Sequence, residues 1–126
     1  MKDIETIKDI QLFVNSFYNK IQKDELLGPI FAKRIINNNW QPHLAKMYNF
    51  WSTLLLCTQT YNGSPFDKHI GLGIGTDHFK QWLALFDETI DSLFIGEKAN
   101  IAKERANNIG LTFEYKLESL KNAPII

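Results

Sequence analysis

The sequence predicts an all-α fold, and three features of the chain indicate it. Apolar residues recur at spacings of three and four along most of the chain, which is the repeat of a helix with one buried face. Alternating patterns typical of strands are scarce. The 126 residues, of which 44% are hydrophobic and 13% aromatic, suffice for a domain with its own core. We therefore expect a single domain over residues 1–126, built from about five helices.

The first helix is expected over residues 6–21. Thr6, followed three residues later by Asp9, resembles a capping box at its start. Its inward stripe consists of Ile7, Ile10, Val14, Phe17 and Ile21. The segment 26–31 then breaks this helix and starts a short second one, with Pro29 in its first turn. The three asparagines at 37–39 predict a polar loop.

The third helix is expected from Pro42 to about Leu56. Its apolar residues cover so wide a surface that we expect it to be buried on more than one side. The region from 58 to 77 is the least regular and the richest in glycine. A fourth helix follows, capped by Thr76 or Asp77 and ended by Gly96. Its apolar stripe consists of Phe79, Trp82, Phe86, Ile90 and Leu93.

The last helix is expected from about residue 98 to 120. Gly110 lies in its middle and costs about 1 kcal/mol of helix stability relative to alanine. This glycine therefore indicates the close approach of another helix. The residues expected to point inward are Ile101, Ile109, Phe113, Leu117 and Leu120.

Charge and composition argue against several classes of partner. Fourteen basic and fourteen acidic residues give a formal net charge of zero, whereas nucleic-acid and membrane surfaces attract basic patches. The charged N-terminus does not resemble a secretory signal, and no apolar run is long enough to span a bilayer. Cys57 follows three leucines and is expected to be a small buried residue. We expect a cytoplasmic protein without a nucleic-acid or membrane partner.

Three histidines are the candidates for chemistry, because phosphate-binding loops and zinc-ligand spacings are absent from the sequence. His43 opens an apolar helix face, where a histidine is more often packed than a ligand. His69 precedes a glycine-rich stretch. His78 lies in the first turn of the fourth helix and is expected to be solvated or to cap that helix.

The third and fourth helices together present an unusual set of side chains. An apolar cofactor between them would explain why one interior receives His43, Met47, Phe50 and Trp82. Tyr18 lies on the buried side of the first helix, and its hydroxyl needs a partner there. Such donors around one cavity, with another histidine on iron, are typical of a haem that binds a diatomic ligand. The alternative is an aromatic core in which a backbone carbonyl satisfies the tyrosine, and spacing alone leaves both open.

A set of short segments, taken in order, resembles the truncated haemoglobins, specifically group III. The likeness covers nearly the whole chain and is specific because the ordered set fixes the distances between the pocket positions. It implies a two-over-two helical sandwich around haem. The segments are Phe17-Tyr18, Leu27-Gly28-Pro29-Ile30-Phe31, His43-Leu44-Ala45-Lys46, Asn49-Phe50-Trp51, Tyr61-Asn62-Gly63, Lys68-His69 and the run from His78 to Phe86.

The resemblance assigns a role to each matching residue. His69 corresponds to the proximal histidine that ligates the iron. Tyr18 and Trp82 correspond to distal residues that face the bound ligand, and His43 to the histidine at the mouth of the distal pocket. Proline is frequent in this group after the proximal histidine, whereas this chain has glycines at 71, 73 and 75. That difference concerns the rigidity of the loop and leaves the ligation as expected.

Other positions are expected to contact the haem itself. Phe31 corresponds to the phenylalanine that packs against the haem edge, and Met47 falls where an apolar residue lines the distal cavity. Arg34, Lys46 and Lys68 have the charge to pair with the propionates. The sequence has no Cys-x-x-Cys-His motif, so we expect non-covalent haem b (iron protoporphyrin IX).

The resemblance implies reversible binding of O2, NO or CO at a five-coordinate iron. Two hydrogen-bond donors at the ligand would make O2 release slow, which suits chemistry or sensing better than transport. The alternative is an enzyme that uses the same haem for NO dioxygenation or peroxide reduction, with an external reductase. A third class, a helical interaction module without cofactor, would show no Soret band even after hemin is added. NO consumption with and without a reductant separates the binder from the enzyme.

Overall fold

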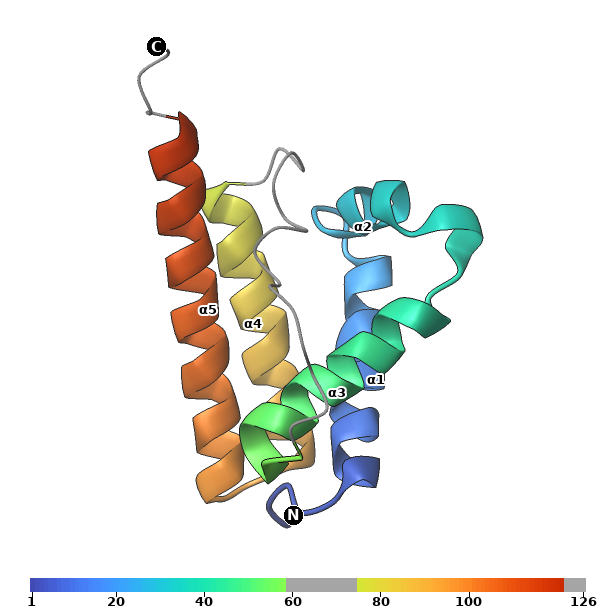
Figure 1. The fold of residues 1–126 in the computed structure, drawn as a ribbon, viewed down its shortest axis with the longest axis vertical. Coiled ribbons are helices and arrows are strands. Elements are labelled where there is room, and N and C mark those ends of the chain that lie inside the picture. The colour runs from blue at the N-terminus through green and yellow to red at the C-terminus, as the bar shows by residue number, and fades with distance from the viewer. Residues whose placement is uncertain (59–74, 122–126) are drawn as a thin grey trace.

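The computed structural model describes residues 1–58 and 75–121, apart from the side chains of Ile36 and of residues 117–121. All regular elements in these ranges are helices, which confirms the all-α prediction (Figure 1). In chain order they are α1 (Ile7–Lys23), α2 (Gly28–Arg34), the short 3₁₀ turn η1 (Ile36–Asn38), α3 (Gln41–Leu56), α4 (Thr76–Leu93) and α5 (Glu97–Lys121).

The helix α1 packs against three other helices, α2, α3 and α4. The predicted capping box is present, since Thr6 Oγ1 accepts a hydrogen bond from the Asp9 N–H at 3.3 Å and the Asp9 carboxylate accepts one from the Thr6 N–H at 3.0 Å. Ile7 is half exposed, so the buried stripe begins at Ile10, one turn later than predicted. The buried apolar residues of α1 are Ile10, Phe13, Val14, Phe17, Tyr18 and Ile21.

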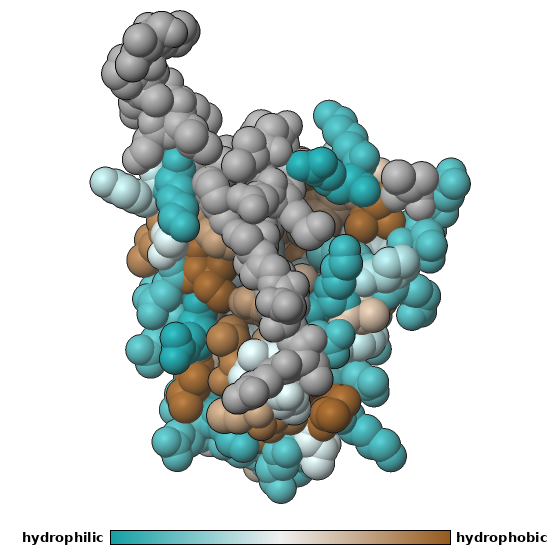
Figure 2. All heavy atoms as spheres, viewed as in Figure 1, coloured by the Kyte–Doolittle hydropathy of each residue, from teal (hydrophilic) through white to brown (hydrophobic). Residues whose placement is uncertain are grey.

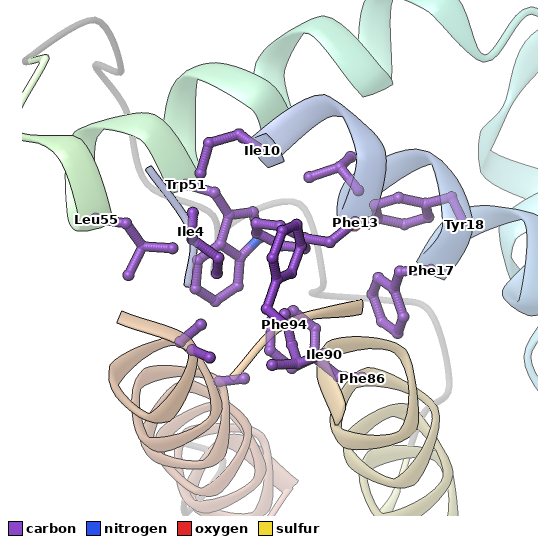
Figure 3. Packing of buried hydrophobic residues seen from close by; sticks show 14 of the residues in the cluster. Ile4, Ile10, Phe13, Phe17, Tyr18, Trp51, Leu55, Phe86, Ile90 and Phe94 are labelled. Carbon is purple, nitrogen blue, oxygen red and sulfur yellow. The ribbon is translucent and has the colours of Figure 1, made fainter. Parts of the chain in front are cut away.

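The helices pack as two crossed pairs, α1 with α3 and α4 with α5. The helix α1 contacts α3 on one side and α4 on the other, and α4 contacts α5. Figure 1 shows α4 and α5 side by side, with α3 crossing in front of them. The Phe13 ring of α1 meets Trp51 of α3 edge-on at 5.8 Å and, across to the other pair, Phe86 of α4 at 5.9 Å (Figure 3). This aromatic centre holds the two pairs together.

The contact between α4 and α5 depends on small residues. The buried stripe of α5 consists of Ala99, Ala102, Ala106 and Gly110. A Cβ at Gly110 would lie 3.4 Å from Leu83 Cδ1, which confirms the close approach of another helix. The larger residues predicted to point inward, Ile101, Ile109 and Phe113, are half-buried, and Ile101 packs against the core. Leu117 and Leu120 have side chains outside the described part.

Two predicted helix ends need correction. Gly75, not Thr76 or Asp77, is the N-cap of α4, and His78 Nδ1 accepts a hydrogen bond from the Gly75 N–H at 3.0 Å. The capping role expected of His78 is therefore confirmed. The helix α4 ends at Leu93, so Gly96 does not cap it. Gly96 instead has φ +142° in the turn before α5, where a Cβ would lie 2.5 Å from Asp3 Cγ.

Cys57 is exposed, so the prediction of a buried residue is wrong. It is the C-cap of α3 and has φ 57°, and this left-handed turn carries its side chain away from the face of the preceding leucines. The expected loop at 37–39 overlaps the turn η1, in which Asn37 and Asn38 both have positive φ. Asparagine tolerates this backbone better than most residues.

The surface agrees with the composition. Figure 2 shows hydrophilic residues around the rim of the described part and apolar residues gathered toward its middle. None of the helices in the two described ranges is long and apolar enough to cross a membrane.

Candidate functional site

Four aromatic side chains from three elements form one cluster, which we call the aromatic cluster: Tyr18 of α1, Phe31 of α2, and Trp40 and His43 at the start of α3. The His43 ring lies 4.8 Å from the Tyr18 ring, at an interplanar angle of 90°. The Tyr18 ring also lies 5.9 Å from Phe31 and 6.1 Å from Trp40. Three residues predicted to share a site, Tyr18, Phe31 and His43, are therefore brought together.

Local sequence explains why these side chains meet. Tyr18 is on the buried face of α1, beside the fully enclosed Phe17 (Figure 3). The chain turns sharply after α1, where the Asp24 carboxylate accepts hydrogen bonds from the N–H groups of Leu26 and Leu27 at 3.1 and 2.9 Å. The helix α2 starts directly after this turn, at Gly28, and its Phe31 ring lies against Tyr18.

The Tyr18 hydroxyl is the most informative polar group of the cluster. Tyr18 is 5% exposed, and burial raises the pKa of its hydroxyl well above the ordinary value. The hydroxyl therefore keeps its proton at neutral pH. No hydrogen bond joins it to another of the described residues, whereas the Tyr48 hydroxyl on α3 donates to Asn15 Oδ1. The protonated Tyr18 hydroxyl is therefore available as a hydrogen-bond donor.

Trp82 approaches the same region from α4. Its ring lies 5.6 Å from Phe17, edge to face, and Phe17 in turn lies 5.0 Å from Tyr18. Trp82 is half-buried and is linked to the aromatic cluster through Phe17, not by a ring contact of its own with the described residues of the cluster. Next to it, Gln81 Nε2 donates to Asp24 Oδ1 at 2.6 Å. This bond ties α4 to the corner between α1 and α2 and so fixes Trp82 relative to Tyr18.

The remaining predicted residues are distributed as follows. His69, the expected iron ligand, lies outside the described residues, as does Lys68. Met47 is one turn beyond His43 on α3, half-buried and packed against the core. Arg34 at the end of α2 and Lys46 on α3 are exposed. No group of three His, Cys, Asp or Glu residues within 1–58 and 75–121 could hold a metal ion.

Sequence reasoning missed Trp40. It precedes α3 as its N-cap and therefore falls outside the helical repeat that identified the other residues. Its ring stacks on Phe31 at 6.0 Å and 21°, and it meets His43 at 6.0 Å and 82°. The spacing of three between Trp40 and His43 would have been a usable signal.

A groove of about 200 Å³ between α1 and α3 lies apart from these residues. Its lining includes Gln11, Tyr48 and Ser52, and no residue of the aromatic cluster.

The helix arrangement and the aromatic cluster point to a class of protein. The family described as bacterial-like globin matches residues 4–111, which is most of the chain. The chain belongs to this family, and membership implies a haem-binding globin.

Within the globins, the similarity is to one group. The chain is 37% identical over 118 residues to the group 3 truncated hemoglobin ctb of Campylobacter jejuni, which covers 90% of this chain and 93% of that one. The crystal structure of the group III truncated hemoglobin from Campylobacter jejuni matches with a TM-score of 0.84 and 36% identity, over 93% of this chain and 95% of that one. The chain is therefore a group III truncated haemoglobin with the truncated globin fold, as the sequence predicted.

The described residues fit the haem that the family implies. A globin needs an apolar wall with few donors on the side where the ligand binds. Phe31, Trp40 and Phe17 supply apolar surface around Tyr18. The hydroxyl of the buried Tyr18 side chain keeps its proton and supplies a donor.

Proposed function

We propose that this chain would bind haem b without a covalent bond, through His69, and that Tyr18, Trp82 and His43 would contact O2 or another diatomic ligand. The observation that carries the proposal is the buried Tyr18 side chain, whose hydroxyl keeps its proton and whose ring lies 4.8 Å from the His43 ring. When bound, haem supplies an iron with one open position at which O2, NO or CO binds reversibly.

Each protein group has a role that its chemistry allows. The protonated Tyr18 hydroxyl donates a hydrogen bond to the ligand, and the Trp82 indole N–H, which can only donate, offers a second. Hydrogen bonds to a charged acceptor contribute about 1.5–3 kcal/mol each, which corresponds to a roughly 10- to 150-fold slower release. His43 is half-buried at the start of α3, and its proposed role is to control entry of the ligand. We therefore expect tight O2 binding.

Phe31 and Met47 line the pocket, and exposed Arg34 and Lys46 carry the charge that haem propionates attract. The four residues differ in what they contribute, because the first two exclude water while the cations act at the rim.

Hemin titration followed by O2 release tests the proposal. Purified protein should develop a Soret band that saturates at one hemin per chain, and the ferrous form should bind CO and O2. Tyr18→Phe should release O2 about 10- to 150-fold faster.

Tyr48→Phe is the matched control, because it removes a tyrosine hydroxyl that donates to Asn15 away from the cluster. It should release O2 at the wild-type rate. The proposal is wrong if no Soret band forms, or if both variants release O2 equally fast.

A further inference from the structure

Trp40 is fixed in place before it meets His43. Its indole Nε1 donates to Asn38 Oδ1 at 3.0 Å, and its face stacks on Phe31 at 6.0 Å. Asn37 and Asn38 both have positive φ, so the turn that presents this acceptor has a defined shape. The plane of the Trp40 ring is thus set from two directions.

His43 lies among three rings that meet it nearly at right angles. Tyr18 lies at 4.8 Å and 90°, Trp40 at 6.0 Å and 82°, and Phe31 at 6.1 Å and 71°. Edge-to-face contacts of this kind are favourable and depend on direction. An imidazole that turned out toward solvent would lose these three ring contacts, including the one with Tyr18.

Trp40 differs from the other two rings in its position on the chain. It is the N-cap of α3, three residues before His43, so its side chain neighbours that of His43 on the surface of the helix. Tyr18 and Phe31 belong to other helices and bound the pocket itself. Trp40 is therefore the ring contact of His43 that comes from its own end of α3.

We propose that Trp40 is a positioning residue that keeps the His43 imidazole turned in toward Tyr18 and so sets how often the entrance to the ligand pocket opens. The inference rests on the proposed function, since it concerns access to the same pocket. It assigns Trp40 no contact with the ligand.

The first test combines ligand kinetics with NMR of the haem-loaded CO complex. Trp40→Leu should change His43 from one χ1 rotamer to an average over several. It should also raise the CO association rate about two- to tenfold, the range expected for the loss of one ring contact. In the His43→Ala background the same substitution should leave the rate unchanged, because Trp40 acts through His43.

Tyr48→Leu is the matched control, since it also removes a half-buried ring from α3 but one whose hydroxyl bonds to Asn15. It should leave the His43 rotamer and the CO association rate as in the wild type. An equal effect of both leucine substitutions would overturn the proposal, because general loosening of α3 would then explain the rate.

A second pair of variants, which keeps the Trp40 ring, tests the proposal in case Trp40→Leu fails to fold. Asn38→Gly and Asn38→Asp both tolerate positive φ, but only aspartate keeps an acceptor for Trp40 Nε1. Asn38→Gly should shift the His43 rotamers and the CO rate in the same direction as Trp40→Leu, by a smaller factor. Asn38→Asp should keep the wild-type His43 rotamer and the wild-type CO association rate.

The outcomes separate the two proposals. A protein that binds haem and CO normally, but whose His43 rotamers and CO rate do not respond to Trp40→Leu or Asn38→Gly, refutes the role of Trp40 alone. A protein that takes up no haem refutes the proposed function.

Discussion

Tyr18 and Trp82 differ in how many hydrogen-bonding roles each can take. The phenol can donate to a ligand or accept from a neighbour, whereas the indole can only donate. The two rings are linked through Phe17, and both belong to helices tied together by the Asp24–Gln81 bond. Their positions are therefore coupled, and a change in one donor alters the setting of the other.

We predict that Trp82→Phe raises the O2 dissociation rate at least as much as Tyr18→Phe. The double variant should differ from the sum of the two single effects on the activation free energy, because both donors address one acceptor. Stopped-flow O2 release from the three variants measures this. Release from Trp82→Phe at the wild-type rate would show that Trp82 only forms a wall.

The packing of α5 on α4 shows how elements approach closely. Gly110 faces Leu83, and the added Cβ of an alanine would lie 3.4 Å from Leu83 Cδ1, which is ordinary contact with the end of a flexible side chain. Alanine also favours the helix by about 1 kcal/mol over glycine. The interface therefore has room for one methyl group and for little more.

We predict that Gly110→Ala raises the free energy of unfolding by up to about 1 kcal/mol. Gly110→Leu should lower it by about 1–3 kcal/mol, because the larger side chain forces the two helices apart. Urea unfolding of both variants, in the same ligation state, measures this. A destabilising alanine together with a harmless leucine would contradict the described contact.

Elements were more predictable than the faces they bury. The capping pair Thr6 and Asp9 predicts the start of α1 from local sequence alone. The apolar repeat from Ile10 to Ile21 predicts the buried face of this helix. The fully buried alanines of α5 were not predicted, because hydropathy favours large residues whereas small residues allow the close contact with α4. Trp40 was missed because it precedes the first residue of α3, and only residues within the helix were compared with the apolar repeat.

The site was predicted mainly through the ordered segments. Tyr18, Phe31 and His43 belong to three helices, and no spacing within one helix could show that their rings meet. The likeness of the ordered segments supplied that information. The role of His69 stays a prediction, since its position is outside the described residues.

At the scale of the whole molecule, the N-terminal segment connects the first and last helices. The Asp3 carboxylate accepts hydrogen bonds from the N–H groups of Lys98 and Ala99 at 2.9 and 2.8 Å, at the start of α5. Lys2 Nζ lies 2.6 Å from Asp9 Oδ2 at the start of α1. Two adjacent residues thus hold together helices that are far apart in sequence.

This connection makes stability depend on acid. Burial opposes the charged form of Asp9, but the Lys2 hydrogen bond and the N–H groups of Glu5 and Thr6 outweigh it and lower the pKa of Asp9 to about 2, from an ordinary value of 3.8. In Asp3, burial is likewise outweighed by the N–H groups of Lys98, Ala99 and Ile4, and the pKa is lowered. A lowered pKa means stability that is present above the unfolded-state pKa and is lost as the pH falls through the folded-state value.

We predict that Asp9→Asn lowers the free energy of unfolding by about 1–2 kcal/mol at pH 7. The substitution keeps an acceptor oxygen but removes the charge. The difference from the wild type should shrink between about pH 4 and pH 2, where the native carboxylate also becomes neutral. Urea unfolding across this range measures it, and a difference that stays constant down to pH 2 would contradict the role of the charge.

Resonance Raman spectroscopy of the ferrous, haem-loaded protein tests the central proposal most directly, because it observes the bond between the iron and its protein ligand. The wild type should show an iron–histidine stretch. His69→Gly should lose that band together with stable haem binding, and added imidazole should restore an axial ligand, whereas an unchanged stretch in His69→Gly would contradict the assignment of His69.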